Sequence, residues 1–211
     1  MEAPPTYRPQ KKSNIWLWII LGGLGLCCLG GAALLGGGAY FGMKVAGPMV
    51  ECMMSAEFLQ KAVVAYAEDN GGKLPAADKW QDQVKPYYER IMSTKGDKMK
   101  GSPFKPFAAD GDWGCKLDND AHTTFAFNTA LSGKKLDDIQ NKSETVLFFE
   151  VDKSGRNVNQ KYDPAKLGTP PKRFPEAHWT TMSVDGDAHM VGATGQPVKG
   201  DGNVKTSVKF D

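Results

Sequence analysis

Residues 49–75, MVECMMSAEFLQKAVVAYAEDNGGKLP, contain the pattern that decides the fold of this chain. Five of them recur at spacings of four, three, four and three: Cys52, Ala56, Leu59, Val63 and Tyr66. Residues with this spacing lie on one face of a helix. Asn70-Gly71-Gly72 favours the positive φ angles that end a helix, and Pro75 follows. We therefore predict an amphipathic helix over Met49–Asn70.

A second helix is predicted to follow, with Asp78 as its cap. Its inward residues are predicted to be Trp80, Val84 and either Tyr87 or Tyr88. Pro86 removes a backbone donor, so we expect the first part of this helix to end or bend near Lys85. Residues 101–120 are rich in Gly, Pro and Asp and are predicted to form a loop.

The hydrophobic period then changes to two, which is typical of strands. The predicted strands are His122–Asn128, Thr145–Val151, a hairpin of Trp179–Val184 and His189–Val191 around Asp185-Gly186, and Val204–Phe210. Lysines on the last of these favour an exposed edge. Helices followed by strands indicate an α+β domain in which the first helix packs on one antiparallel sheet.

An uncharged apolar stretch precedes this domain. The 29 residues of Ile15–Met43 contain no charged side chain. As a helix with a rise of about 1.5 Å per residue they would measure about 43 Å, which exceeds the roughly 30 Å of hydrocarbon in a bilayer. A secretory signal has an apolar core of about 7–15 residues. We therefore predict an uncleaved transmembrane anchor.

Basic residues flank this stretch unequally. Arg8, Lys11 and Lys12 precede it, whereas Lys44 alone follows closely. The positive-inside rule then places the N-terminus in the cytoplasm. We predict residues 1–14 as a cytoplasmic tail, 15–43 as a single span of the inner (cytoplasmic) membrane, and 44–211 as an extracytoplasmic domain in the periplasm.

Charge and cysteine usage restrict the partners and the compartment. The 26 basic and 24 acidic residues leave a net charge of +2, so no large basic field is present to hold a nucleic acid. The expected partners are the membrane and envelope proteins. Cys52 and Cys115 would both lie in an oxidising compartment, where disulfides persist. The sequence leaves open whether they pair, because it does not give their distance.

The order of the motifs resembles that of a known family. The apolar span is followed by Leu59–Pro75, Trp80, Pro86-Tyr87, Phe125–Gly133, Thr145–Glu150, and His178 ahead of Asp185-Gly186. Together these resemble the pseudopilin-like, prepilin-processing-associated family, whose signature is a His, nine residues, then Asp-Gly. Here six residues separate His178 from Asp185, and the cleavage glycine and nearby glutamate of processed prepilins do not precede Ile15.

The resemblance implies a type II secretion or type IV pilin-like fold. Such a fold has a long N-terminal helix, with a transmembrane half and an amphipathic half, packed on an antiparallel sheet beneath a loop-rich head. It also implies a role in envelope assembly or secretion, with secretion or pilin-like machinery among the partners.

Four potential metal ligands cluster near the predicted hairpin: His178, Asp185, Asp187 and His189. Their side chains suit zinc or a harder metal. Alternatively the two histidines simply flank a hairpin, because Asp-Gly is a common turn dipeptide. A shared ion requires both histidines on one sheet face, and a shift of one residue reverses the face. An envelope metal-binding protein or metallohydrolase is therefore the alternative function.

Asp-x-Asp pairs occur at Asp110/Asp112, Asp118/Asp120 and Asp185/Asp187. Oxygen-rich loops of this kind can hold calcium, but none has the glycine and glutamate of an EF-hand. Solvated turns are the favoured interpretation.

The sequence contains no established catalytic motif. It lacks Gly-x-Ser-x-Gly, a phosphate-binding loop and Cys-x-x-Cys, so no set of residues supports catalysis. We predict a non-enzymatic, single-pass membrane protein with a pseudopilin-like external domain that serves a structural or interaction role.

Overall fold

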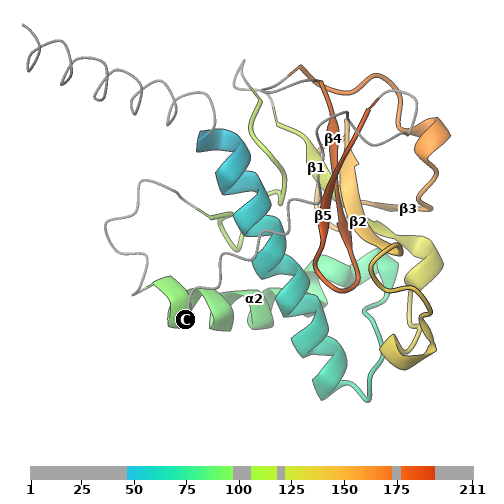
Figure 1. The fold of residues 1–211 in the computed structure, drawn as a ribbon. Coiled ribbons are helices and arrows are strands. Elements are labelled where there is room, and N and C mark those ends of the chain that lie inside the picture. The colour runs from blue at the N-terminus through green and yellow to red at the C-terminus, as the bar shows by residue number, and fades with distance from the viewer. Residues whose placement is uncertain (1–46, 97–105, 118–121, 173–176, 193–211) are drawn as a thin grey trace, which may run out of the picture. The chain divides into compact units, whose positions relative to one another are not determined.

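The computed structural model describes residues 47–96, 106–117, 122–172 and 177–192. Over these residues the fold is α+β, with a helix at 47–69, which we call the N-terminal helix, a second helix α2 (Trp80–Gly96) and one sheet (Figure 1). The strands are β1 (Thr124–Asn128), β2 (Val146–Val151), β3 (Asn159–Gln160), β4 (Trp179–Ser183) and β5 (Ala188–Val191). The described residues also contain four 3-10 helices: η1 (Ala77–Lys79) just before α2, η2 (Thr129–Leu131) and η3 (Leu136–Asp138) between β1 and β2, and η4 (Pro164–Lys166) between β3 and β4.

Two predicted elements lie outside the described residues, namely the apolar span 15–43 and the strand Val204–Phe210. Among the helices that the structure does describe, none is both long and apolar enough to cross a bilayer.

The N-terminal helix confirms the predicted amphipathic pattern. Cys52, Ala56, Leu59 and Val63 are buried against the sheet, in the same cluster as residues of β1, β2 and β4. Tyr66 is half-buried, and its ring packs edge-on against Tyr87. The helix ends where Gly71 and Gly72 adopt positive φ angles of 65° and 79°. These residues form a helix because one apolar stripe is buried in the core, four of its five members completely.

The sheet has the strand order β3-β1-β2-β4-β5. The pairs β1–β2, β2–β4 and β4–β5 are antiparallel, as predicted. β3 is an addition that the sequence did not predict, and it pairs with β1 in parallel, placing Asn159 beside Phe127. With two polar residues, β3 has too little hydrophobic alternation to be recognised as a strand.

Both faces of the sheet are covered. One face packs on the N-terminal helix through Phe125, Phe127, Phe148 and Met182. The other face carries a smaller cluster of Ala126, Phe149 and Val151, which contacts side chains of the segment 152–172. This explains why the run 146–151 is apolar without alternation, apart from Glu150, since residues on both sides of β2 are buried.

The second helix differs from the prediction in length. α2 does not end at Lys85 but continues through Pro86 to Gly96. Trp80, Val84 and Tyr88 lie one turn apart and are fully buried, whereas Pro86 is exposed. The backbone bond lost at Pro86 is therefore outweighed by three large side chains buried on both sides of it.

The start of α2 is capped by a distant residue rather than by Asp78. The side-chain oxygen of Asn157 accepts hydrogen bonds from the backbone N–H groups of Gln81 (2.8 Å) and Asp82 (3.3 Å). In return the Asn157 amide donates to the Asp82 carboxylate (2.6 Å), which also accepts from Arg156 (2.5 Å). The hydrogen bond from Asn157 and that from Arg156 hold the pKa of Asp82 below its usual range.

This arrangement predicts a pH dependence of stability. Because the pKa of Asp82 is lower in the folded protein, its contribution is present above the ordinary pKa of about 3.9 and is lost as the pH falls through the folded value. We therefore expect the free energy of unfolding of the wild type to fall more steeply below about pH 5 than that of Asp82→Asn. Urea unfolding at a series of pH values measures this. If the free energy of unfolding depends on pH in the same way for both proteins, the hydrogen bonds from Asn157 and Arg156 to Asp82 do not stabilise the fold.

Candidate functional site

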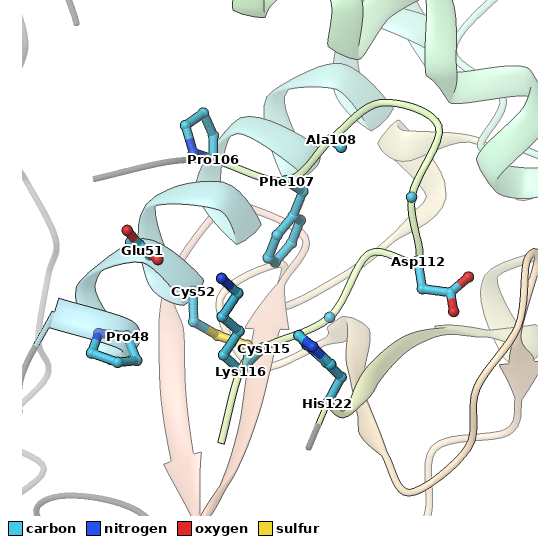
Figure 2. A pocket seen from close by; sticks show the side chains of 12 residues that line it. Pro48, Glu51, Cys52, Pro106, Phe107, Ala108, Asp112, Cys115, Lys116 and His122 are labelled. Atoms are coloured by element: carbon cyan, nitrogen blue, oxygen red, sulfur yellow. A yellow bond between two sulfur atoms is a disulfide. The ribbon is translucent and has the colours of Figure 1, made fainter. Parts of the chain in front are cut away.

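A pocket of about 270 Å³ opens beside the first turns of the N-terminal helix (Figure 2). The helix contributes Pro48, Glu51 and Cys52, the segment 106–116 forms the opposite wall, and His122 completes the lining. The predicted loop character of this segment is confirmed over 106–117, which contain no helix or strand beyond an isolated bridge between Lys116 and His122.

The pocket wall is fixed by a close backbone approach. Residues 113–115 run beside the chain leading into β1, where Cys115 O accepts from Thr123 N (3.0 Å) and Trp113 O accepts from Phe125 N (2.7 Å). At Gly114 the two chains are so close that a Cβ atom would lie 1.6 Å from the Thr123 carbonyl oxygen. Glycine is therefore required at this position, and it places Cys115 against the helix.

Cys52 and Cys115 form a disulfide in this wall, which resolves the pairing that the sequence left open. Their Cα atoms lie 5.0 Å apart and the two residues are 63 positions apart in the chain. Both are buried, although both line the pocket. In the chain-entropy model, closing a loop of this length stabilises the fold by about 4 kcal/mol.

A buried carboxylate lies behind the disulfide. Glu150 on β2 is fully buried, and it is opposite Phe125 in the register of β1 and β2, which places it on the face toward the N-terminal helix. Its Oε1 accepts from the hydroxyl of Thr123, and its Oε2 accepts from the backbone N–H of Thr180 (2.6 Å). Glu150 is not among the residues predicted from the sequence, although a charged residue within the otherwise apolar run 145–151 was a signal for it.

Polar side chains surround the pocket opening. Glu51, Asp112, Lys116 and His122 line it, and the last three are exposed. The nearby Asp110 forms an ion pair with Lys85 on α2. The hydrogen bond from Lys85 lowers the pKa of Asp110. Of the Asp110/Asp112 pair, Asp110 therefore contacts α2, whereas Asp112 lines the pocket opening.

The four predicted metal ligands are not brought together. In the β4–β5 hairpin Thr181 is opposite His189, so His189 lies on the same face as Thr181 and Trp179. His178 precedes Trp179 by one residue and is buried, on the face of Met182. Thr181, the partner of His189, lies three residues after His178. Successive residues of an extended chain point to opposite faces, so the two histidines project from opposite faces of the sheet.

The two aspartates at this hairpin belong to its turn. Asp185 accepts a hydrogen bond from the hydroxyl of Ser183 (2.6 Å), while the backbone of Asp187 pairs with Ser183. Gly186 between them has a φ of 96°. The turn thus engages the carboxylate of Asp185 and the backbone of Asp187. Asp118 and Asp120 lie outside the described residues.

Comparisons of the chain with models of protein families, with curated proteins and with solved structures find no match.

Proposed function

We propose that this chain is a non-enzymatic, single-pass membrane protein whose pseudopilin-like domain, 44–211, lies outside the cytoplasm and serves a structural or interaction role in envelope assembly or secretion. The observation that carries the proposal is the Cys52–Cys115 disulfide. Disulfides persist in oxidising compartments. The first cysteine of this disulfide, Cys52, lies nine residues after Met43, the last residue of the apolar stretch.

The arrangement of helix and sheet adds support. A pilin-like domain needs an amphipathic helix that follows its membrane segment and is covered by an antiparallel sheet. The helix at 47–69 buries its apolar stripe under β1, β2 and β4. Of the motifs that resemble the prepilin-processing-associated family, Leu59–Pro75 begins on this helix, Phe125–Gly133 begins on β1 and Thr145–Glu150 leads into and along β2.

The alternative function loses its main support. A metallohydrolase built on the hairpin needs His178 and His189 around one ion, and the register of β4 and β5 places them on opposite faces. An interaction role needs no such convergence.

The interaction role is tested by capture of partners with the full chain in mild detergent. The matched control carries residues 1–46 of this chain fused to an unrelated soluble domain, so that anchor-dependent capture is subtracted. We expect at least one envelope protein to be retained by the full chain and absent from the control. The same capture is repeated after chemical cross-linking in membranes. If the folded full chain retains no protein that the control lacks in either experiment, the interaction role is refuted.

A further inference from the structure

Three elements bring two sulfur atoms and one carboxylate together beneath the pocket. Cys52 comes from the N-terminal helix, Cys115 from the segment 106–117, and Glu150 from β2. One possible ligand atom from each residue lies within 4.8 Å of the other two. All three residues are at most 2% exposed.

We infer that the reduced protein binds Zn²⁺ through the Cys52 and Cys115 thiolates and the Glu150 carboxylate. Zinc takes sulfur at about 2.3 Å and carboxylate oxygen at about 2.0–2.2 Å in a tetrahedral arrangement, so its ligand atoms lie about 3.5–3.8 Å apart. The three atoms lie within 4.8 Å of one another, and cleavage of the disulfide lets the two sulfurs separate toward that spacing. The fourth position faces the pocket and takes water.

The Glu150 carboxylate is already oriented for this role. The hydroxyl of Thr123 and the backbone N–H of Thr180 each hold one of its oxygens. Hydrogen bonds of this kind fix ligating carboxylates in established metal sites.

The pocket supplies a route to the sulfurs. Cys52 and Cys115 form part of its wall, with Lys116 and His122 beside them (Figure 2). A cavity of about 270 Å³ admits a hydrated ion and the thiol of a small reductant. The site is therefore accessible from solvent although its ligands are buried.

The disulfide and the zinc ion exclude each other. A dithiol reductant transfers two electrons and two protons: its own sulfurs become a disulfide, and the Cys52–Cys115 bond is cleaved to two thiols. Zn²⁺ then displaces the two thiol protons. In the reverse direction a disulfide oxidant takes up two electrons and two protons and becomes a dithiol, the Cys52–Cys115 bond forms again, and Zn²⁺ is released. The redox state of one cysteine pair therefore determines whether the protein carries zinc.

The test uses the full chain in detergent with Cys27→Ser and Cys28→Ser, which leaves Cys52 and Cys115 as its cysteines. Oxidised protein and protein reduced under argon, freed of reductant, are titrated with Zn²⁺ against a chromophoric chelator. We expect one equivalent to bind to the reduced protein and none to the oxidised protein. Zinc should also raise the melting temperature of the reduced protein, because the ion closes the same loop as the disulfide.

Two variants separate the proposed ligand from its surroundings. Glu150→Gln should weaken zinc binding by at least about tenfold, whereas Glu51→Gln, the same change in the pocket lining, should leave it unchanged. Reduced protein that stays folded by circular dichroism and binds no zinc overturns the proposal. Reduced protein that unfolds even with zinc overturns it as well, and unchanged affinity in Glu150→Gln removes Glu150 from the site.

Discussion

Replacing Gly114 by alanine is expected to destabilise the domain by about 3 kcal/mol or more, at the upper end of overpacking effects. The new Cβ would lie 1.6 Å from Thr123 O and 2.8 Å from Thr124 Cα, which are backbone atoms and cannot rotate away. Relief requires the segment 113–115 to move away from the chain that leads into β1, which breaks the hydrogen bonds from Thr123 N to Cys115 O and from Phe125 N to Trp113 O. Urea unfolding followed by circular dichroism measures the loss.

Gly111→Ala is the matched control for this prediction. It lies in the same segment, and its Cβ would meet Ala108 O at 3.5 Å, an ordinary contact. We expect its stability to stay within about 0.5 kcal/mol of wild type. Equal unfolding midpoints for the two alanine variants would show that the close approach at Gly114 is not present in solution.

Leu59→Asp is expected to unfold the domain outright. Leu59 is fully buried between the N-terminal helix and the sheet. The substitution loses about 1.5–3 kcal/mol of apolar burial and introduces a carboxylate with no partner into the core, which costs several kcal/mol more. These losses are comparable to the whole stability of a typical domain, about 5–15 kcal/mol.

The control for Leu59→Asp is Val50→Asp on the same helix. Val50 is 42% exposed, so the same kind of change there removes little buried surface. Its expected effect is within about 0.5 kcal/mol. A Leu59→Asp variant that melts at the wild-type temperature would show that this face of the helix is not the one covered by the sheet.

The elements that were predictable from the sequence carry their own periodic signal. Cys52, Ala56, Leu59 and Val63 mark a helix whose apolar stripe is self-evident, and the alternation around Phe125 and Phe127 marks a strand. The turn at Asp185-Gly186 was predictable because its positive φ favours glycine. In each case the local sequence favours the same helix, strand or turn that the tertiary structure contains.

The features that were missed depend on contacts between distant segments. Asn157 caps α2 from a loop that lies 76 positions beyond Gln81, and local sequence gives no sign of that pairing. Gln60 interrupts the helix face with a polar side chain, which donates to Val184 O (2.7 Å) in the hairpin turn. Glu150 acquires its meaning from Thr123, Thr180 and the two cysteines. In the sequence such residues interrupt or lie outside the hydrophobic pattern, and their role becomes evident only when the structure shows their distant partners.

We propose that domain 44–211 lies outside the cytoplasm, held by a single membrane span. Reporter fusions at each terminus of the full chain measure this directly, with a phosphatase that is active only after export and a fluorescent protein that folds only in the cytoplasm. We predict phosphatase activity at the C-terminus and cytoplasmic fluorescence at the N-terminus. Fluorescence from a C-terminal fusion, together with an inactive phosphatase there, would contradict the account.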